Sequence, residues 1–410
     1  MAERTLDEVT AGGTTGTSDG HDDADAGSGE GPPAGAAGGS ETAEDPPRGP
    51  YDDAEPVLRL EGVRKEYGTE TAVDGLNLTV RDGELLTLLG PSGCGKTTTL
   101  RMIAGLAAPT DGVVVVADET VAGEGVVTDP EDRDVGMVFQ EFALFPHLSV
   151  AENVAFGLQD ADDGETEARV ADLLELVGLT EYADQSPDTL SGGQRQRVAL
   201  ARSLAPEPDV LLLDEPFSNL DVRLRVRMRE DVRRILKEAG VTAVSVTHDQ
   251  EEALSISDRV AVMHDGTLQQ VGRPEAVFEH PESRFVAEFI GQASFLPGRF
   301  EGGSVETALG TLDEELLQGL TPDYDGADVD VLVRPDDLEA VPAGGDGDGV
   351  IVGRTYTGPS FVYDVELDGG RVVRCEHNHA TEFALDRRVT VELVADHTLA
   401  WYPAADGVAE

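Results

Sequence analysis

The chain has 410 residues, enough for two or three domains, and its 40 % hydrophobic content suits ordinary globular packing. Its 81 acidic residues against 30 lysines and arginines give a formal net charge of −51, which argues against a general nucleic-acid binder with a basic surface. Two cysteines, no secretory signal core and no long apolar stretch indicate a reducing cytoplasm and exclude a membrane-spanning segment.

The acidic excess has two explanations. One is a solubilising tail added to a charged surface. The other is adaptation to very high salt, where carboxylates keep the surface hydrated and salt screens their repulsion. We favour the second, and with it a halophilic source, because the excess continues beyond the N-terminal region.

Residues 1–55 contain mostly Gly, Ala, Asp, Ser, Thr and Pro and almost no large apolar side chain. Such a segment cannot bury enough surface to offset its ordering entropy. We therefore predict a disordered acidic tail.

The next feature is a predicted strand at Leu85–Leu89 followed by the loop Gly90–Thr97 and a predicted helix at Lys96–Gly105. The loop fits the phosphate-binding pattern G-x-x-x-x-G-K-[ST] in the strand-loop-helix context that the pattern requires. Its glycines let backbone N–H groups turn toward phosphate, and the helix N-terminus favours negative charge. Lys96 would reach the β- and γ-phosphates of a nucleotide, and Thr97 would hold Mg²⁺.

Further apolar runs predict a mostly parallel, buried sheet; they are Val135–Phe139, Val210–Leu213 and Ala243–Val246. Between Val150 and Pro206 the pattern is helical, with segments at Ala168–Leu176 and Gly193–Leu204, which predicts a helical insert.

The strand at Val210–Leu213 is followed by two acidic residues. Asp214 at the strand tip is placed to bind Mg²⁺, directly or through water. Glu215 would act as general base on an attacking water or orient it.

The segment Leu190–Gln194 reads Leu-Ser-Gly-Gly-Gln and precedes a helix. Ser191 and the two glycines could form a second anion-binding helix N-terminus, or Ser191 could be an ordinary helix cap. Its place about 20 residues before the acidic strand tip favours the anion site.

Together with Gln140, the segment Ser218–Asp221 and His248, these motifs occur in the order seen in ATP-binding cassette (ABC) proteins, which residues 57 to about 290 resemble. The resemblance implies an α/β P-loop NTPase cassette at 56–290, with a RecA-like core and a helical subdomain at about 145–206. It implies an ATP hydrolase that uses ATP and Mg²⁺.

The resemblance also assigns roles. Glu215, His248, Gln140 and Lys96 would be catalytic, and Thr97, Gln140 and Asp214 would hold the metal. Tyr67 would stack on adenine, and Asp221 would bridge to a partner chain. The full nucleotide-binding set would be Tyr67, Gly90, Pro91, Ser92, Gly93, Cys94, Gly95, Lys96, Thr97, Thr98, Ser191, Gly192, Gly193, Gln194 and Asp221.

In that family the Ser191 segment closes over ATP held by the Gly90 loop of another cassette. This chain has one cassette, so the resemblance implies a head-to-tail homodimer with ATP between the copies. The stretch Gln140–Asn153 resembles the part of importer ATPases that docks on a separate membrane permease. Its apolar side chains Phe142, Leu144, Phe145 and Leu148 either line that docking groove or belong to the core.

Beyond Gly291 the chain carries closely spaced strands, predicted at Val329–Val333, Gly349–Arg354, Phe361–Leu367, Arg371–Arg374 and Arg388–Leu393. This spacing predicts a small β-barrel domain at 291–410. The domain resembles the OB-like (TOBE) regulatory domains of binding-protein-dependent importers. Phe295–Gly298, Leu309–Leu312, Tyr356–Ser360 and Ala400–Pro403 are most similar to the ferric-iron group. Molybdate/tungstate, sulfate, polyamine and sugar importers share the layout.

The resulting hypothesis is a peripheral ATPase subunit at the cytoplasmic face of the membrane, working with a permease and, indirectly, an extracytoplasmic solute-binding protein. The main alternative is a soluble, non-transport ABC ATPase. Six arginines between Arg223 and Arg234 raise a nucleic-acid alternative, but they scatter around a predicted helix and acids flank them, which favours an ion-paired face.

Overall fold

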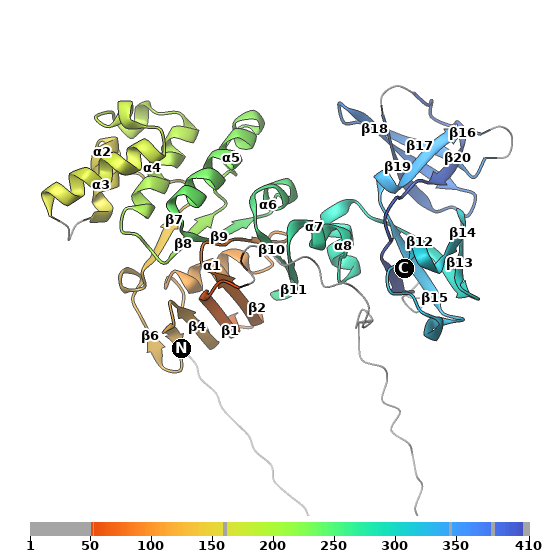
Figure 1. The fold of residues 1–410 in the computed structure, drawn as a ribbon, viewed down its shortest axis with the longest axis horizontal. Coiled ribbons are helices and arrows are strands. Elements are labelled where there is room, and N and C mark those ends of the chain that lie inside the picture. The colour runs from red at the N-terminus through yellow and green to blue at the C-terminus, as the bar shows by residue number, and fades with distance from the viewer. Residues whose placement is uncertain (1–50, 52, 159–161, 344–346, 379–381, 405–410) are drawn as a thin grey trace, which may run out of the picture. The chain divides into compact units, whose positions relative to one another are not determined.

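The computed structural model describes residues 51, 53–158, 162–343, 347–378 and 382–404, all within one unit of the chain that spans residues 38–410 (Figure 1). The predicted tail, residues 1–55, lies almost entirely outside the described residues. Of its last members, Tyr51 accepts a hydrogen bond from Lys237 Nζ at 2.5 Å, and the Lys237 ammonium lies 4.6 Å from the Tyr51 ring centroid.

A six-stranded sheet forms the centre of the first domain, with strand order β11-β10-β3-β9-β8-β7. The neighbouring strands are parallel except β11, which is antiparallel to β10. The predicted parallel sheet is thereby confirmed. The strands are β3 (Leu85–Leu89), β7 (Val135–Val138), β8 (Val210–Asp214), β9 (Thr242–Thr247), β10 (Arg259–His264) and β11 (Thr267–Gly272).

A second, antiparallel sheet was not predicted; its order is β2-β1-β4-β5-β6. One hydrophobic core joins it to the first sheet, with side chains such as Leu58, Leu88 and Leu100 fully buried. Leu100 belongs to α1, so this helix packs into the core that the two sheets share. The strands are β1 (Pro56–Tyr67), β2 (Glu70–Arg81), β4 (Asp111–Val116), β5 (Glu119–Gly123) and β6 (Val126–Val127).

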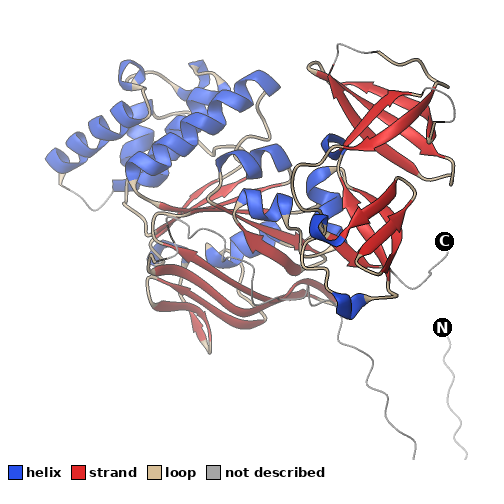
Figure 2. Cartoon of the chain, turned by 45° about the vertical axis from the view of Figure 1, so that its right-hand side comes forward, coloured by secondary structure: helices blue, strands red, loops and turns tan. Residues whose placement is uncertain are grey.

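The helical insert is confirmed: three helices between 150 and 204 share a second core with residues of β8 and α5. They are labelled in Figure 1, and helices are drawn blue in Figure 2. They are α2 (Val150–Ala155), α3 (Asp163–Leu176) and α4 (Gly192–Leu204). The other helices are α1 (Lys96–Ile103), α5 (Val222–Ala239), α6 (Gln250–Ile256), α7 (Pro274–Glu279) and α8 (Arg284–Gly291). The predicted helix at Lys96–Gly105 therefore ends two residues early, where Gly105 adopts φ +81°.

The C-terminal domain is all-β, as predicted, and consists of two five-stranded sheets around one core that includes Phe300 and Tyr363. The first has the order β14-β13-β12-β15-β21 and the second β16-β20-β17-β18-β19. Their bounds are β12 (Ser294–Glu301), β13 (Ser304–Thr307), β14 (Gly310–Asp313), β15 (Asp328–Val333), β16 (Leu338–Pro342), β17 (Gly349–Tyr356), β18 (Ser360–Leu367), β19 (Val372–Asn378), β20 (Arg388–Leu393) and β21 (Trp401–Pro403).

Candidate functional site

The chemically distinctive loops leave the central sheet at one edge. Leu89 at the end of β3 pairs with Thr247 of β9, and Asp214 of β8 pairs with Val246. Val138 of β7 pairs with Leu213 in the same register. Since these strands are parallel, the segments that begin at Gly90, Asp214, Gln140 and His248 all start from the same carboxyl edge, where ligands of α/β sheets bind.

Two glycines of the loop after β3 lie directly against neighbouring backbone. A Cβ at Gly90 would lie 2.2 Å from the carbonyl oxygen of Met263, and one at Gly95 would lie 2.4 Å from that of Ala72. Gly95 also adopts φ +102°, which L side chains rarely reach. Only glycine fits these two positions without moving backbone, so the sequence dictates a loop whose N–H groups remain available to an anion.

Lys96 lies at the start of α1 and is buried, with 5 % of its surface exposed. Its ammonium donates to the carbonyls of Gly90 at 2.7 Å and Pro91 at 2.9 Å, so the loop wraps around this charge. Pro91, Thr97 and Thr98 are half-buried, while Ser92 and Gly93 are exposed. A buried ammonium, a helix N-terminus and an open backbone cradle fit a nucleotide's phosphates.

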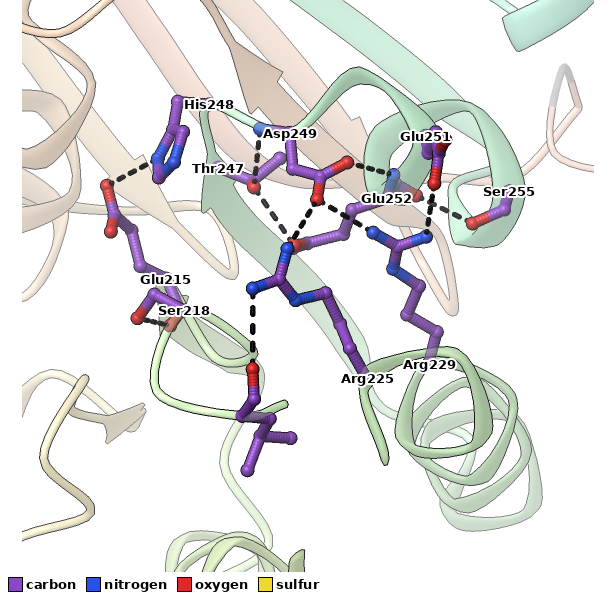
Figure 3. Close-up of polar contacts among 11 residues, drawn as sticks. Glu215, Ser218, Arg225, Arg229, Thr247, His248, Asp249, Glu251, Glu252 and Ser255 are labelled. Atoms are coloured by element: carbon purple, nitrogen blue, oxygen red, sulfur yellow. Dashed lines mark hydrogen bonds and ion pairs between the residues drawn. The ribbon is translucent and has the colours of Figure 1, made fainter. Parts of the chain in front are cut away.

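The Glu215 carboxylate contacts two other predicted residues. Its Oε1 is 3.3 Å from Nδ1 of His248 (Figure 3), and its Oε2 accepts from Nε2 of Gln140 at 3.5 Å. Gln140 Nε2 also donates to Ser218 Oγ at 3.1 Å. Glu215 adopts φ +45°, a strained conformation for a non-glycine residue that is typical of functional sites. The structure thus places the predicted base beside both predicted water-orienting side chains.

Asp214 sits next to Glu215 at the tip of β8. Burial raises the pKa of the Asp214 carboxyl, the Glu215 charge raises it further, and Arg101 opposes them. Among the described residues no three His, Cys, Asp or Glu side chains form a ready metal site. The oxygen atoms of Thr97, Gln140 and Asp214 nonetheless suit Mg²⁺, which prefers few protein ligands together with phosphate oxygens.

The Ser191 segment contacts residues other than those of the β3 loop. Ser191 caps α4: its Oγ accepts from Gln194 N at 3.4 Å, and its own N–H donates to Gln194 Oε1 at 2.9 Å. Gly192 and Gly193 pack on Leu220 and Met228, where a Cβ would come within 3.2 and 2.8 Å. Asp221 caps α5 by accepting from Leu224 N at 3.0 Å. Ser191 and Asp221 are exposed, so both helix starts face outward.

Two further predicted residues differ in exposure. Tyr67 ends β1, is 50 % exposed and has the Lys65 ammonium 4.9 Å from its ring centroid. Its hairpin reaches the Gly95 turn through Ala72. Cys94 is buried within the loop, and burial raises the pKa of its thiol, with Lys96 opposing that shift.

A pocket of about 380 Å³ opens beside the predicted permease-docking stretch. It is lined by Glu141, Phe142, Leu144, Pro146, Pro187, Asp188, Gly192, Arg195 and Asn219. Phe142 is also buried in the helical core, and Phe145 packs on Phe156 with ring centroids 4.4 Å apart. Phe142 and Leu144 therefore line the pocket and pack in the core at the same time, so for them the two sequence-based alternatives are not exclusive.

Sequence reasoning missed the side chains that hold the site's loops. Arg202 of α4 donates to the carbonyls of Ala143 at 2.7 Å and Phe142 at 3.0 Å. Arg225 and Arg229 of α5 both donate to Asp249. For Arg225 and Arg229 the only signal in the sequence was the arginine-rich helix. Its interpretation as an ion-paired face agrees with these contacts.

Comparison with known proteins places these features in context. Residues 73–218 match the ABC transporter family and residues 331–401 match the TOBE domain. The chain is 45 % identical to the spermidine/putrescine import ATP-binding protein of Rubrobacter xylanophilus, over 86 % of this chain and 96 % of that protein. It is 44 % identical to the Fe(3+) ions import ATP-binding protein of Agrobacterium fabrum, over 78 % and 91 %.

A third relative is the trehalose/maltose import ATP-binding protein of Thermococcus litoralis, 48 % identical over 68 % of this chain and 78 % of that one. Among solved structures, a Clostridium perfringens protein described as part of an ABC transporter complex is 30 % identical. It has a TM-score of 0.50 and covers 55 % of this chain and 92 % of its own. Each helix in the described part of the chain is too short or too polar to cross a membrane.

Proposed function

The chain belongs to the ATP-binding import subunits of ABC transporters, with a C-terminal TOBE domain, and from this premise we propose how it hydrolyses ATP and what it energises. The observation that carries the proposal is the convergence of Glu215, Gln140 and His248 beside the Gly90–Thr97 loop on one sheet edge. The proposed cycle is hydrolysis of MgATP between two copies of the chain.

Each residue has a defined part in that reaction. The Gly90–Thr98 backbone and Lys96 bind the β- and γ-phosphates, and Tyr67 stacks on the base. Thr97, Asp214 and Gln140 would hold Mg²⁺, which would offset phosphate charge. Glu215 accepts a proton from the attacking water while the water oxygen bonds to the γ-phosphorus. The bond between the γ-phosphorus and ADP breaks as this bond forms. His248 and Gln140 orient that water.

The second half of the site comes from a partner copy in this proposal. At the N-terminus of α4, beside the exposed Ser191 and its capping partner Gln194, the N–H groups of Gly192 and Gly193 and the helix dipole would be offered to a phosphate. Asp221 is the exposed N-cap of α5, and Gly192 packs on its neighbour Leu220. Two copies arranged head to tail would present these groups to each other's Gly90 loop.

The partner in transport would be a separate permease, docked at the pocket beside Gln140–Asn153, with a solute-binding protein acting through it. That pocket contains both apolar and polar side chains, which suits a short amphipathic helix. The chain would then work peripherally at the cytoplasmic face. No nucleic-acid role is proposed.

For the cargo we propose ferric iron, with polyamines and sugars as the alternatives. Relatives named for polyamines, for iron and for trehalose/maltose are 45 %, 44 % and 48 % identical, which does not separate the three. Since the ATPase need not touch its cargo, ligand binding by the cognate solute-binding protein is the decisive measurement. A pocket that binds spermidine and not Fe³⁺ would transfer the proposal to polyamine import.

The catalytic proposal is tested by ATP turnover of the purified chain in molar KCl. Glu215→Gln keeps the shape of the side chain and removes the base, so kcat should fall about 10²- to 10⁴-fold while ATP still binds. The exposed carboxylate Glu230 on α5 provides a control, and Glu230→Gln should leave kcat unchanged. Undiminished turnover in Glu215→Gln would remove Glu215 from its role.

A further inference from the structure

Asp249 is the residue directly after His248, and its carboxylate collects three hydrogen bonds. Oδ1 accepts from the backbone N–H of Glu252 at 3.0 Å, which caps α6. Oδ2 accepts from Arg229 Nη2 at 2.8 Å and from Arg225 Nη1 at 3.1 Å (Figure 3). The loop that carries His248 is therefore fixed to α5, which precedes it by about 20 residues in the chain.

Arg225 also reaches the segment that begins at the catalytic base. Its Nη2 donates to the Leu220 carbonyl at 3.4 Å, the last residue before the Asp221 cap. At the other end of this segment, Ser218 Oγ donates to the Glu215 carbonyl at 2.9 Å and accepts from Gln140. One guanidinium thus joins the His248 loop to the Glu215–Asp221 segment (Figure 3).

Arg225, Arg229 and Asp249 form a cluster that is partly shielded from solvent, so the charges of these side chains interact strongly. The side chains of Arg229, Asp249 and Arg225 are 8 %, 22 % and 29 % exposed. Burial alone would raise the pKa of Asp249, but the Glu252 N–H and the two guanidinium groups lower it below its usual value. Loss of one partner from a shielded pair of this kind leaves an uncompensated charge, so the pair is strongly held.

The other side of His248 is fixed as well. Thr247 ends β9, and its Oγ1 accepts from the Asp249 N–H at 3.1 Å and donates to Glu252 Oε2 at 3.0 Å. His248 itself is exposed and has its contact with Glu215. Its direction is consequently set by neighbours on both sides, of which Asp249 alone connects to α5.

We propose that Asp249 is a positioning residue for ATP hydrolysis and that Arg225 and Arg229 link its loop to the Glu215–Asp221 segment. The cluster acts through His248 and touches no substrate atom. It rests on the proposed function, since it serves the geometry of Glu215 and His248. In the two-copy arrangement, a shift of Asp221 would be passed through Leu220 and Arg225 to the His248 loop.

The test is steady-state ATP hydrolysis by Asp249→Asn, Arg225→Gln and the double variant. Asparagine is a good helix N-cap, so Asp249→Asn should keep α6 while losing the charge that binds both arginines. We expect kcat to fall roughly tenfold in each single variant, with KM for ATP unchanged. The double variant should lose much less than the product of the two single losses, because both single changes remove the contact between Arg225 and Asp249. Arg225→Lys should restore part of kcat.

The control is Arg227→Gln, an exposed arginine on the same helix, which should match the unmodified chain. Unchanged kcat in Asp249→Asn would overturn the proposal, as would additive losses in the double variant. Parallel falls in kcat, ATP affinity and melting temperature would also overturn it, because they show only a structural role. If the unmodified chain does not hydrolyse ATP, the proposed function is wrong. If the unmodified chain hydrolyses ATP and the link variants have the same kcat, only the proposed link is wrong.

Discussion

At the residue scale, Glu252 is a carboxyl group in a place where its charge is costly. It is 3 % exposed, and burial raises its pKa from the ordinary 4.5 to about 8, while the Thr247 hydroxyl opposes that rise. Asp249 also raises the pKa, and Arg229 and Arg225 lower it. Glu252 is therefore mostly protonated at neutral pH, and the neutral form is the one that this position accommodates.

This makes a prediction about stability and pH. In the unfolded chain Glu252 ionises near pH 4.5, whereas in the folded chain it holds its proton to about pH 8. Its contribution to stability must then decline as pH rises from about 4.5 to 8 and stay level above that. Glu252→Gln cannot ionise, so its stability relative to the unmodified chain should rise across this range, on the order of a few kcal/mol.

Denaturant unfolding at constant salt, at pH 5, 6, 7 and 8, measures that difference. Glu230→Gln, at an exposed position on α5, should give a constant difference from the unmodified chain. Parallel pH profiles for Glu252→Gln and the unmodified chain would show that Glu252 is ionised in the folded state.

The sequence offered candidates for the residues that carry the chemistry and missed the side chains that contact their loops. Lys96, Glu215 and His248 follow strands in recognisable motifs, so their shared sheet edge could be anticipated. The contact between Arg225 and Asp249 joins residues 24 positions apart. It depends on how α5 packs beside α6, and no local pattern encodes that packing.

At the scale of elements, α4 connects the Ser191 cap to the Gln140 loop. Arg202, near the end of α4, donates to the carbonyls of Phe142 and Ala143, whose φ angles are +62° and +45°. Left-handed backbone at two successive non-glycine residues is unfavourable, so a guanidinium that satisfies both carbonyls stabilises this turn. Burial lowers the pKa of Arg202, and its charge strengthens both bonds.

We therefore expect Arg202→Met to loosen residues 140–146 selectively. Hydrogen–deuterium exchange of their amides, followed by mass spectrometry, should become faster, and unfolding should cost about 1–3 kcal/mol less. Arg197→Met provides the control on the same helix, because Arg197 donates to the Val177 carbonyl at 3.0 Å instead. It should affect the amides near Val177. Unchanged amide exchange at 140–146 in Arg202→Met would show that the turn is stable without Arg202.

The elements were predicted unevenly for a physical reason. Strands buried on both faces, such as β3 and β8, are almost continuous apolar runs and are easily recognised. Strands β1 and β2 interleave polar and apolar residues, and several bulges shift their register, so their alternation is broken. The antiparallel sheet was missed on that account. In the C-terminal domain β15, β17, β18, β19 and β20 were predicted because Gly and Asp turns separate them, whereas β12, β13, β14, β16 and β21 were missed.

At the scale of the whole molecule, a net charge of −51 bears on assembly. Two copies that meet across ATP bring together surfaces of the same sign, and their repulsion is long-ranged at low salt. At molar salt the screening length is about 3 Å, so that the repulsion is confined to direct contacts. The proposed homodimer should therefore be studied in concentrated KCl.

The central claim is that the ATP site is shared between two chains, and the molar mass of the Glu215→Gln protein tests it most directly. Light scattering in molar KCl should give the 43.3 kDa of one chain without nucleotide and about twice that mass with MgATP. Adding Ser191→Arg should abolish the increase while ATP still binds. A Glu215→Gln chain that binds MgATP and keeps the mass of a single chain would contradict the account.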